Sequence, residues 1–211
     1  MNLLSGSNLP WSIAPLNPQE APWHLLLAAD PSRDNVQRYL RSCAGFAARE
    51  TTPDSPHGRG AILGIRLLMA LPAASAFRRA NPAFKFDSDP PIPMDAPVSE
   101  DCWPEQTPPP ASSHGSLPAQ WEVMNLAVAP TWQHQGVGSV LLQQAIAFAR
   151  AQGAKQLLVG TGSFGDQLLF YQRSGFRVTG IERDFFLQHY TTQLWERGAQ
   201  HKDMLRLSLD L

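Results

Sequence analysis

The sequence is poor in cysteine and has no excess of charge of either sign. Cys43 and Cys102 are its only two cysteines in 211 residues. This is too few for a disulfide framework or a thiolate metal cluster, so we expect a reducing compartment and no bound metal. Lysine and arginine number 17 against 18 aspartates and glutamates, a net charge of -1. No global field therefore attracts nucleic acid or an anionic membrane, and any phosphate-bearing ligand must be held by local geometry.

Long apolar runs are also missing. No stretch approaches the roughly 20 apolar residues that cross a bilayer, and the first residues lack the basic and apolar regions of a secretory signal. The sequence therefore predicts a cytoplasmic protein without a membrane partner. The composition, 43% hydrophobic and 17% charged, supplies enough apolar material for the core of one domain of ordinary size.

Proline is the residue type in excess. The chain has 19 prolines, and they cluster after residue 82. Because consecutive prolines remove backbone donors and hold the chain extended, we expect residues 72–120 to be a Pro-rich, disordered insertion, with a functional lid as the alternative. Residues 1–21 show no periodicity and are expected to be an irregular lead-in. The domain then spans residues 22–211, interrupted by the insertion.

Short patterns predict the elements before the insertion. Asp30 is a candidate helix cap and Pro31 a candidate first helical residue, since proline at that position loses no hydrogen bond. Residues 43–48 and 61–71 are short apolar segments on either side of a loop and predict a pair of strands. A buried helix is the alternative for the second segment.

The last part of the chain alternates strand and helix. Helices are expected at residues 135–152 and 166–174, each followed by a glycine that can end it. Strands are expected at 122–128, 156–161, 177–181 and 205–211. This alternation predicts a layered α/β domain.

Two glycines, Gly136 and Gly138, stand at the entry to the first of these helices. A helix N-terminus presents unpaired N–H groups at the positive end of the helix dipole, and glycine lets an anion approach them closely. Glycines at a helix start can also mark tight packing alone. The segment lacks the Gly-Lys-Ser/Thr of a triphosphate loop, and Leu141 stands where the dinucleotide fingerprint needs a third glycine, so a dinucleotide-dependent oxidoreductase is poorly supported.

The wider spacing resembles the acyl-CoA-binding motif of the GNAT N-acetyltransferase superfamily. After an apolar strand and a proline come Gln133, Gly136 and Gly138, at the positions of that motif. Residues 170–176, Phe-Tyr-Gln-Arg-Ser-Gly-Phe, resemble the family's Phe-Tyr-x-x-x-Gly-Phe segment. The resemblance implies a GNAT-like single α/β domain with a central mixed, mostly antiparallel sheet flanked by helices. One departure is Phe164, where many relatives carry an asparagine.

The resemblance also implies acetyl-CoA as co-substrate. Backbone groups of Leu126 and Val128 would bind the pantetheine arm as if it were an added strand, and the following N–H groups would hold the pyrophosphate. The residues assigned to the cofactor in this way are Leu126, Ala127, Val128, Gln133, His134, Gln135, Gly136, Val137, Gly138 and Ser139.

Two residues are candidates for catalysis. By the resemblance, Tyr171 protonates the departing thiolate, and a phenol with a pKa of about 10 stays protonated at neutral pH; an aromatic residue packed on the sheet is the alternative. The acceptor amine must lose a proton, and Glu122 is the candidate base, unless it is only a solvated strand end. Strand alternation places Glu122 and Leu126 on one face and Asn125 on the other, unless a bulge intervenes.

The acceptor side is less specific. Asn125 is a candidate for positioning a water or the acceptor. Asp184, His189 and Tyr190 follow the third strand of the last part of the chain, where the family often builds acceptor specificity; surface charges around core aromatics are the alternative.

The function expected from this resemblance is an acyltransferase, an N-acetyltransferase that moves the acetyl group of acetyl-CoA to a primary amine of a small molecule or peptide. It would need no nucleic acid and act as a monomer or homodimer. A catalytically silent CoA-binding sensor or interaction module on the same fold is the alternative.

Overall fold

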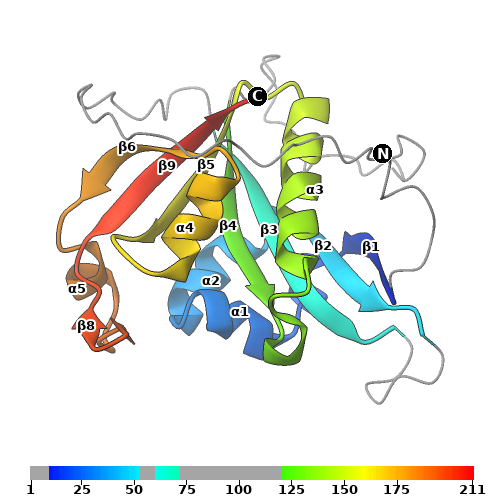
Figure 1. Cartoon of the computed structure of the whole chain (residues 1–211), viewed down its shortest axis with the longest axis horizontal. Helices are drawn as coiled ribbons and strands as arrows, with labels where there is room; N and C mark the ends of the chain where they lie inside the picture. The colour runs from blue at the N-terminus through cyan, green and yellow to red at the C-terminus, as the bar shows by residue number, and fades with distance from the viewer. Residues whose placement is uncertain (1–9, 53–59, 72–119) are drawn as a thin grey trace.

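A computed structural model describes residues 10–52, 60–71 and 120–211. Its centre is a seven-stranded sheet of order β1-β2-β3-β4-β5-β9-β6 (Figure 1). The strands of this sheet are β1 (Trp11–Leu16), β2 (Cys43–Glu50), β3 (Ile62–Leu71), β4 (Gln120–Val128), β5 (Gln156–Gly162), β6 (Arg177–Glu182) and β9 (Met204–Asp210). A separate hairpin pairs β7 (Trp195–Glu196) with β8 (Ala199–Gln200).

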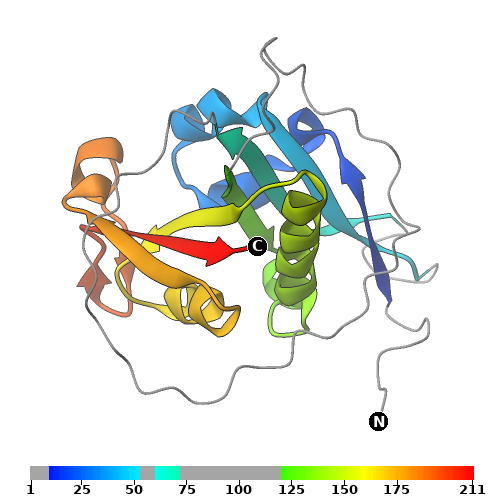
Figure 2. The same cartoon turned by 90° about the horizontal axis from the view of Figure 1, so that it is seen from above.

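Helices cover both faces of the sheet, as the view from above shows (Figure 2). They are α1 (Trp23–Ala29), α2 (Arg33–Leu40), α3 (Val137–Ala151), α4 (Asp166–Arg173) and α5 (Phe185–His189), with short 3-10 turns η1 (Pro18–Glu20) and η4 (Pro130–Trp132). α3 and α4 lie on one face, and α1 and α2 on the other.

Each face has its own apolar core because the elements bury one side. On α3 the buried residues recur every three to four positions: Val137, Leu141, Leu142, Ala145, Ile146, Phe148 and Ala149. Most of these pack with Trp121 and Val123 of β4. Leu25 and Leu26 of α1 and Val36 of α2 pack on the opposite face.

The expected fold is confirmed. Strands and helices after residue 120 follow the predicted order, and residues 43–48 and 61–71 lie in the antiparallel pair β2–β3. Among the described strands of the sheet, β4 and β5 pair in parallel and the other neighbours pair antiparallel. The sheet is therefore mixed and mostly antiparallel.

Two expectations about the first part of the chain are wrong. The lead-in predicted for residues 1–21 contains β1 and η1, and β1 pairs with β2 as an edge strand, an interaction that local periodicity does not reveal. Asp30 does not begin a helix; it ends α1. Ser32 caps α2 instead, and its hydroxyl accepts a hydrogen bond from the Asn35 N–H at 3.3 Å.

Of the insertion expected at 72–120, Gln120 begins β4 and the rest lies outside the described residues.

A bulge in β4 changes which side chains share a face. β3 residues Leu67 and Leu68 pair with Asn125 and Val123, so Met124 is the extra residue. The bulge places Asn125 on the same side as Glu122, facing α1 and α2, while Leu126 packs on the α3 side. In a regular strand the side chains of Glu122 and Leu126 would point to the same face. Because one extra residue reverses the alternation, they point to opposite faces of the sheet here.

Candidate functional site

The parallel strands β4 and β5 separate along their length. They pair from Gln120 with Gln156 to Val123 with Val159, and the pairing stops there although β4 continues to Val128 and β5 to Gly162. The separation begins at the Met124 bulge, where β4 changes its alternation. The second half of β4 therefore has an edge that β5 does not cover.

The backbone register decides which groups face this gap. The Ala129 N–H donates to the Leu63 carbonyl at 2.7 Å, so Ala129 and, two residues earlier, Ala127 direct their backbone groups toward β3. Leu126 and Val128 direct theirs to the other side, toward the gap. The sequence assigned Ala127 to cofactor binding. In the structure its backbone pairs with β3 and its side chain is buried, so it does not face the gap.

The turn between β4 and the start of α3 carries a series of backbone N–H groups. His134 and Gly136 both have positive φ, 60° and 83°, and such alternation makes successive N–H groups converge into an anion-binding concavity. Gly136 is the N-cap of α3 and has no side-chain cap hydrogen bond. The N–H groups of Val137, Gly138 and Ser139, in the first turn of a 15-residue helix, have no partner within the helix.

Side chains of this turn brace it from outside. The Gln133 amide donates to the Val128 carbonyl at 3.1 Å, and the Gln135 amide donates to the Thr131 carbonyl at 2.7 Å. Val137 is fully buried, so it offers its N–H and not its side chain. The two glutamines therefore fix the shape of the loop, and the N–H groups remain for a ligand.

Tyr171 lies on α4, which covers the same face of the sheet as α3. Its ring packs edge-to-face against Phe170 and Phe176, with centroids 5.2 Å and 5.7 Å apart, and the residue is 8% exposed. Burial raises the pKa of the Tyr171 hydroxyl above its ordinary value. The raised pKa keeps this hydroxyl protonated at neutral pH, so it can donate a hydrogen bond.

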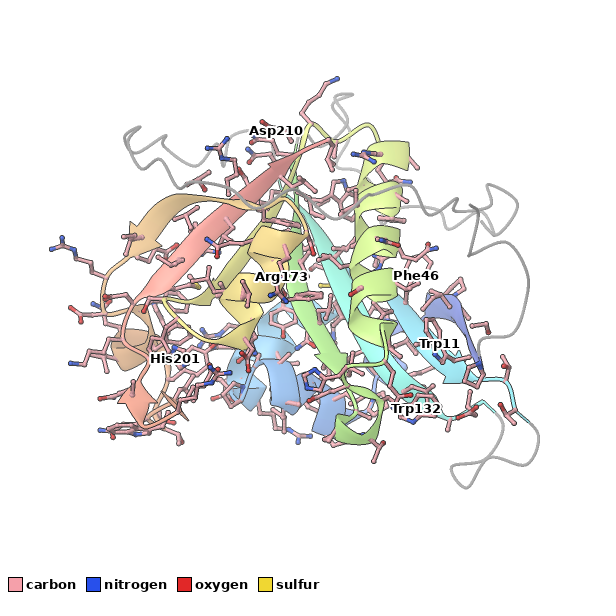
Figure 3. All side chains as sticks on the ribbon, in the orientation of Figure 1. Trp11, Phe46, Trp132, Arg173, His201 and Asp210 are labelled. Atoms are coloured by element: carbon pink, nitrogen blue, oxygen red, sulfur yellow. The ribbon has the colours of Figure 1, made fainter. Side chains whose placement is uncertain are left out.

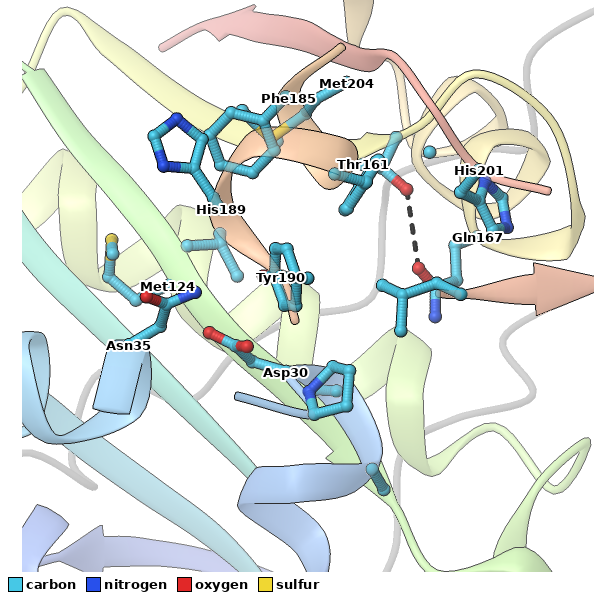
Figure 4. Close-up of a pocket in the computed structure, with 18 of the residues that line it drawn as sticks. Asp30, Asn35, Met124, Thr161, Gln167, Phe185, His189, Tyr190, His201 and Met204 are labelled. Carbon is cyan, nitrogen blue, oxygen red and sulfur yellow. Dashed lines mark hydrogen bonds between the residues drawn. The ribbon is translucent and has the colours of Figure 1, made fainter. Parts of the chain in front are cut away.

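A cavity of about 570 Å³ lies on the opposite side of the β4–β5 gap. Its walls come from the α1–α2 junction, the middle of β4, the end of β5, α5 and the β7–β8 hairpin. Figure 4 shows residues from these elements around the space, among them Asp30, Met124, Thr161 and Tyr190. His201 lines the cavity, and Trp132 belongs to the turn before α3. In Figure 3 both residues lie toward one end of the sheet, and Asp210 lies at the other end. The cavity and the N–H-rich turn therefore lie at one end of the sheet.

Glu122 enters the cavity from β4 as part of a charged triad. The Arg206 guanidinium donates from Nη1 to Glu122 at 2.6 Å and from Nε to Glu182 at 2.5 Å. Burial raises the pKa of Glu122, the Arg206 charge lowers it, and Glu182 raises it. Glu122 is thus a partly buried carboxylate beside the separated strands, and not a solvated strand end.

The expected acceptor residues divide into two groups. His189 and Tyr190 line the cavity. Asp184 does not line it; this residue precedes α5 with a φ of 57°, and its N–H donates to Asp203. Asn125 lies behind the wall, where its side-chain amide donates to the Leu26 carbonyl and the Tyr39 hydroxyl at 3.0 Å and 3.1 Å. Asn125 therefore contacts Tyr39 of the cavity wall and does not itself line the cavity.

Several cavity residues were not found by sequence reasoning. Asp30 and Tyr39 reach the cavity from helices that precede β4 by more than eighty residues, and nothing in their local pattern links them to it. His201 also lines the cavity, stacks on Phe164 at 4.1 Å, and contacts Glu196 at 3.1 Å through Nε2. Phe164, the departure from the family pattern, therefore packs against a residue of the cavity wall.

No helix in the described ranges combines the length and apolar character needed to cross a membrane. No group of three or more His, Cys, Asp or Glu residues that could hold a metal ion occurs in the same ranges.

Comparison with known proteins agrees with this arrangement. A family model described as an acetyltransferase (GNAT) domain matches residues 109–178. The uncharacterized N-acetyltransferase YvbK of Bacillus subtilis is 43% identical over 95 residues, which are 44% of this chain and 61% of that protein. The aligned region thus spans less than two thirds of the relative's length.

Solved structures match over nearly the whole chain. An IAA acetyltransferase from Bacillus cereus is 26% identical with a TM-score of 0.66, covering 95% of this chain and 99% of its own. A GNAT family acetyltransferase from Elizabethkingia anophelis with acetyl-CoA bound is 27% identical, TM-score 0.65, covering 96% and 99%. A Bacillus subtilis acetyltransferase in complex with CoA is 28% identical, TM-score 0.64, covering 95% and 99%.

Separated parallel strands beside an uncapped helix N-terminus, together with these matches, define the class. Residues 109–178 match the GNAT acetyltransferase domain, a domain of acyltransferases, and the chain as a whole is similar to GNAT acetyltransferases of known structure.

Proposed function

We propose that the protein transfers the acetyl group of acetyl-CoA directly to a primary amine. The observation that carries this proposal is the uncovered edge of β4 beyond Val123 next to the uncapped N-terminus of α3. Two similar structures, from Elizabethkingia anophelis and Bacillus subtilis, contain acetyl-CoA and CoA, which supports acetyl-CoA as the co-substrate.

Backbone groups hold the cofactor in this proposal. The N–H groups of residues 134–139 receive the pyrophosphate at the positive end of the α3 dipole. Leu126 and Val128 direct backbone groups toward the gap, and the pantetheine arm takes the place of a neighbouring strand there. The thioester then reaches the bulge at Met124, between Tyr171 on one side of the sheet and the cavity on the other.

The reaction follows from the groups at this point. The acceptor enters from the cavity as an ammonium ion, and Glu122 takes its proton directly or through a water. The neutral amine attacks the thioester carbonyl, the new C–N bond forms, and the C–S bond breaks. The Tyr171 hydroxyl protonates or stabilises the leaving thiolate, and the second proton that the attacking nitrogen loses on forming the amide replaces the one that Tyr171 gives, so the products are the amide and the free thiol of CoA. Because both reactants are held together, proximity supplies much of the rate enhancement.

Ligand-dependent melting and thiol release test this function. Acetyl-CoA at about a hundred times its dissociation constant adds roughly 2.7 kcal/mol of stability, so it should raise the melting temperature by several degrees while NAD leaves it unchanged. Stabilisation by NAD alone would contradict the proposal. Release of free CoA thiol with at least one primary amine separates an enzyme from a silent CoA-binding module, which would bind acetyl-CoA without releasing thiol.

A further inference from the structure

The far wall of the cavity carries a carboxylate that the reaction does not use. Asp30 lies at the junction of α1 and α2 and lines the cavity, whereas Glu122 enters from β4. The Asp30 carboxylate accepts a hydrogen bond from the Ser32 N–H at 3.1 Å. Among the described residues it forms no ion pair, in contrast to Glu122, which Arg206 neutralises.

Aromatic rings surround this carboxylate. The hydroxyls of Tyr39 and Tyr190 lie close enough to Asp30 to lower the pKa of its carboxyl by hydrogen bonding. Figure 4 shows Asp30 between Asn35 and the ring of Tyr190. Tyr190 packs with Phe185 and Phe186, at centroid distances of 6.3 Å and 5.5 Å. The charge of the Asp30 carboxylate attracts an alkylammonium group, and the neighbouring rings offer apolar surface to the alkyl chain of such a ligand.

The unpaired state of Asp30 has a physical cost. Burial raises the pKa of Asp30, and the hydrogen bonds from Ser32, Tyr190 and Tyr39 lower it only in part. A carboxylate removed from water without a counter-ion is unfavourable, and a bound cation removes that penalty. In the described residues Asp30 forms no ion pair, and Arg38 of the same cavity donates to Asn35 instead, so the Asp30 carboxylate can accept a positive group of a ligand.

We propose that Asp30, with the rings of Tyr39 and Tyr190, binds a second cationic group of the acceptor, so that linear diamines are the preferred acceptors. This inference rests on the proposed function: one amine reaches Glu122 and the thioester, and the other stays protonated at Asp30. A volume of about 570 Å³ lies within the usual range for small-molecule sites.

Kinetics with two matched acceptors test the inference. Cadaverine and pentylamine have the same carbon chain and differ in the second amine. We expect kcat/KM for cadaverine to exceed that for pentylamine at least tenfold. Asp30→Asn keeps an oxygen for the Ser32 N–H, so the fold is retained, and it should lower kcat/KM about tenfold for cadaverine but less than twofold for pentylamine. Asp34→Asn, the same change at an exposed position of α2, should alter neither.

Three outcomes would overturn the inference: no preference for cadaverine, an equal loss with both acceptors, or an equal effect of Asp34→Asn. Calorimetric titration of cadaverine into protein saturated with CoA supplies a readout that needs no turnover. Binding that weakens in Asp30→Asn supports the cation site even if no amine releases CoA, in which case only the proposed function fails. Binding that is unchanged in Asp30→Asn contradicts the site.

Discussion

At the scale of single residues, the environment of each candidate differs from that of a free side chain. Tyr171 is packed between Phe170 and Phe176 and has a raised pKa. Glu122 is held by Arg206 and partly buried. The raised pKa keeps the Tyr171 hydroxyl protonated at neutral pH, and the raised pKa of Glu122 makes its carboxylate a stronger base.

Tyr171→Phe should lower kcat by about 100-fold, the lower end for loss of a positioned proton donor. CoA affinity should change less than twofold, because the ring and its packing remain. Steady-state kinetics and calorimetry of CoA binding measure the two effects. Equal losses in rate and in CoA affinity would assign Tyr171 to binding.

The pH profile of kcat/KM should have an acid limb that follows Glu122. Below its pKa the carboxyl is protonated and accepts no proton, so the rate falls as pH drops. Because burial raises this pKa, the limb should lie above 4.5, the ordinary value for glutamate. Arg206 lowers the pKa, so Arg206→Gln should move the limb to higher pH.

Arg38→Gln is the matched control for this profile, since Arg38 lines the same cavity but its guanidinium donates to Asn35. The acid limb of the kcat/KM profile of Arg38→Gln should lie at the same pH as that of the unaltered protein. A limb that is the same in Arg206→Gln as in the unaltered protein would exclude Glu122 as the base.

At the scale of elements, the start of α3 is the site that we propose for the cofactor. The turn before α3 depends on left-handed backbone at His134 and Gly136, which directs successive N–H groups to one point. The glycine spacing predicts a phosphate-binding turn at this place, and the cofactor contacts stay a prediction. The sequence could not reveal that Gln133 and Gln135 brace the turn, because their partners are backbone carbonyls placed by the turn itself.

Gly136→Ala should weaken CoA binding about tenfold. An alanine at a φ of 83° is strained, which costs about 1 kcal/mol and displaces the N–H groups. Gly60→Ala is the control: Gly60 has a φ of 86° and also has no atoms near an added Cβ, but it lies in the β2–β3 connection. Both variants should lose similar stability in denaturant, and only Gly136→Ala should lose CoA affinity. Equal CoA affinity in the two would place the pyrophosphate elsewhere.

At the scale of the whole molecule, the core between the sheet and α3 contains a buried cation. Arg66 of β3 is fully buried, and its three nitrogens have no hydrogen-bond acceptor within the described ranges. Its guanidinium lies over the rings of Phe46 and Phe148, at 4.1 Å and 5.5 Å from their centroids. Burial lowers the pKa of Arg66 to about 9. Ring contacts offset only part of the cost of removing this charge from water.

Arg66→Met should therefore raise the free energy of unfolding, by roughly 1 kcal/mol or more. Stability of the unaltered protein should also rise as pH increases above about 9, because the unfolded chain then binds the proton more tightly than the folded one. The variant should lack this rise. Arg49→Met on β2, where Arg49 donates to the Gly60 carbonyl, is the control and should not stabilise. Denaturant unfolding that shows a loss in Arg66→Met would reveal an anionic partner.

Local sequence determined β4, α3, β5, α4, β6 and β9 and the position of the turn before α3, but not α5 or the β7–β8 hairpin. Helical and strand periods, helix-ending glycines and the motif around Gly136 depend on neighbours a few positions away. Tertiary structure alone decided the cavity that we propose for the acceptor. It joins the α1–α2 junction, β4, α5 and the β7–β8 hairpin, whose contacts span distant parts of the chain. The bulge at Met124 that turns Glu122 and Asn125 to one side is a property of pairing with β3, because register between strands depends on the packing of both partners.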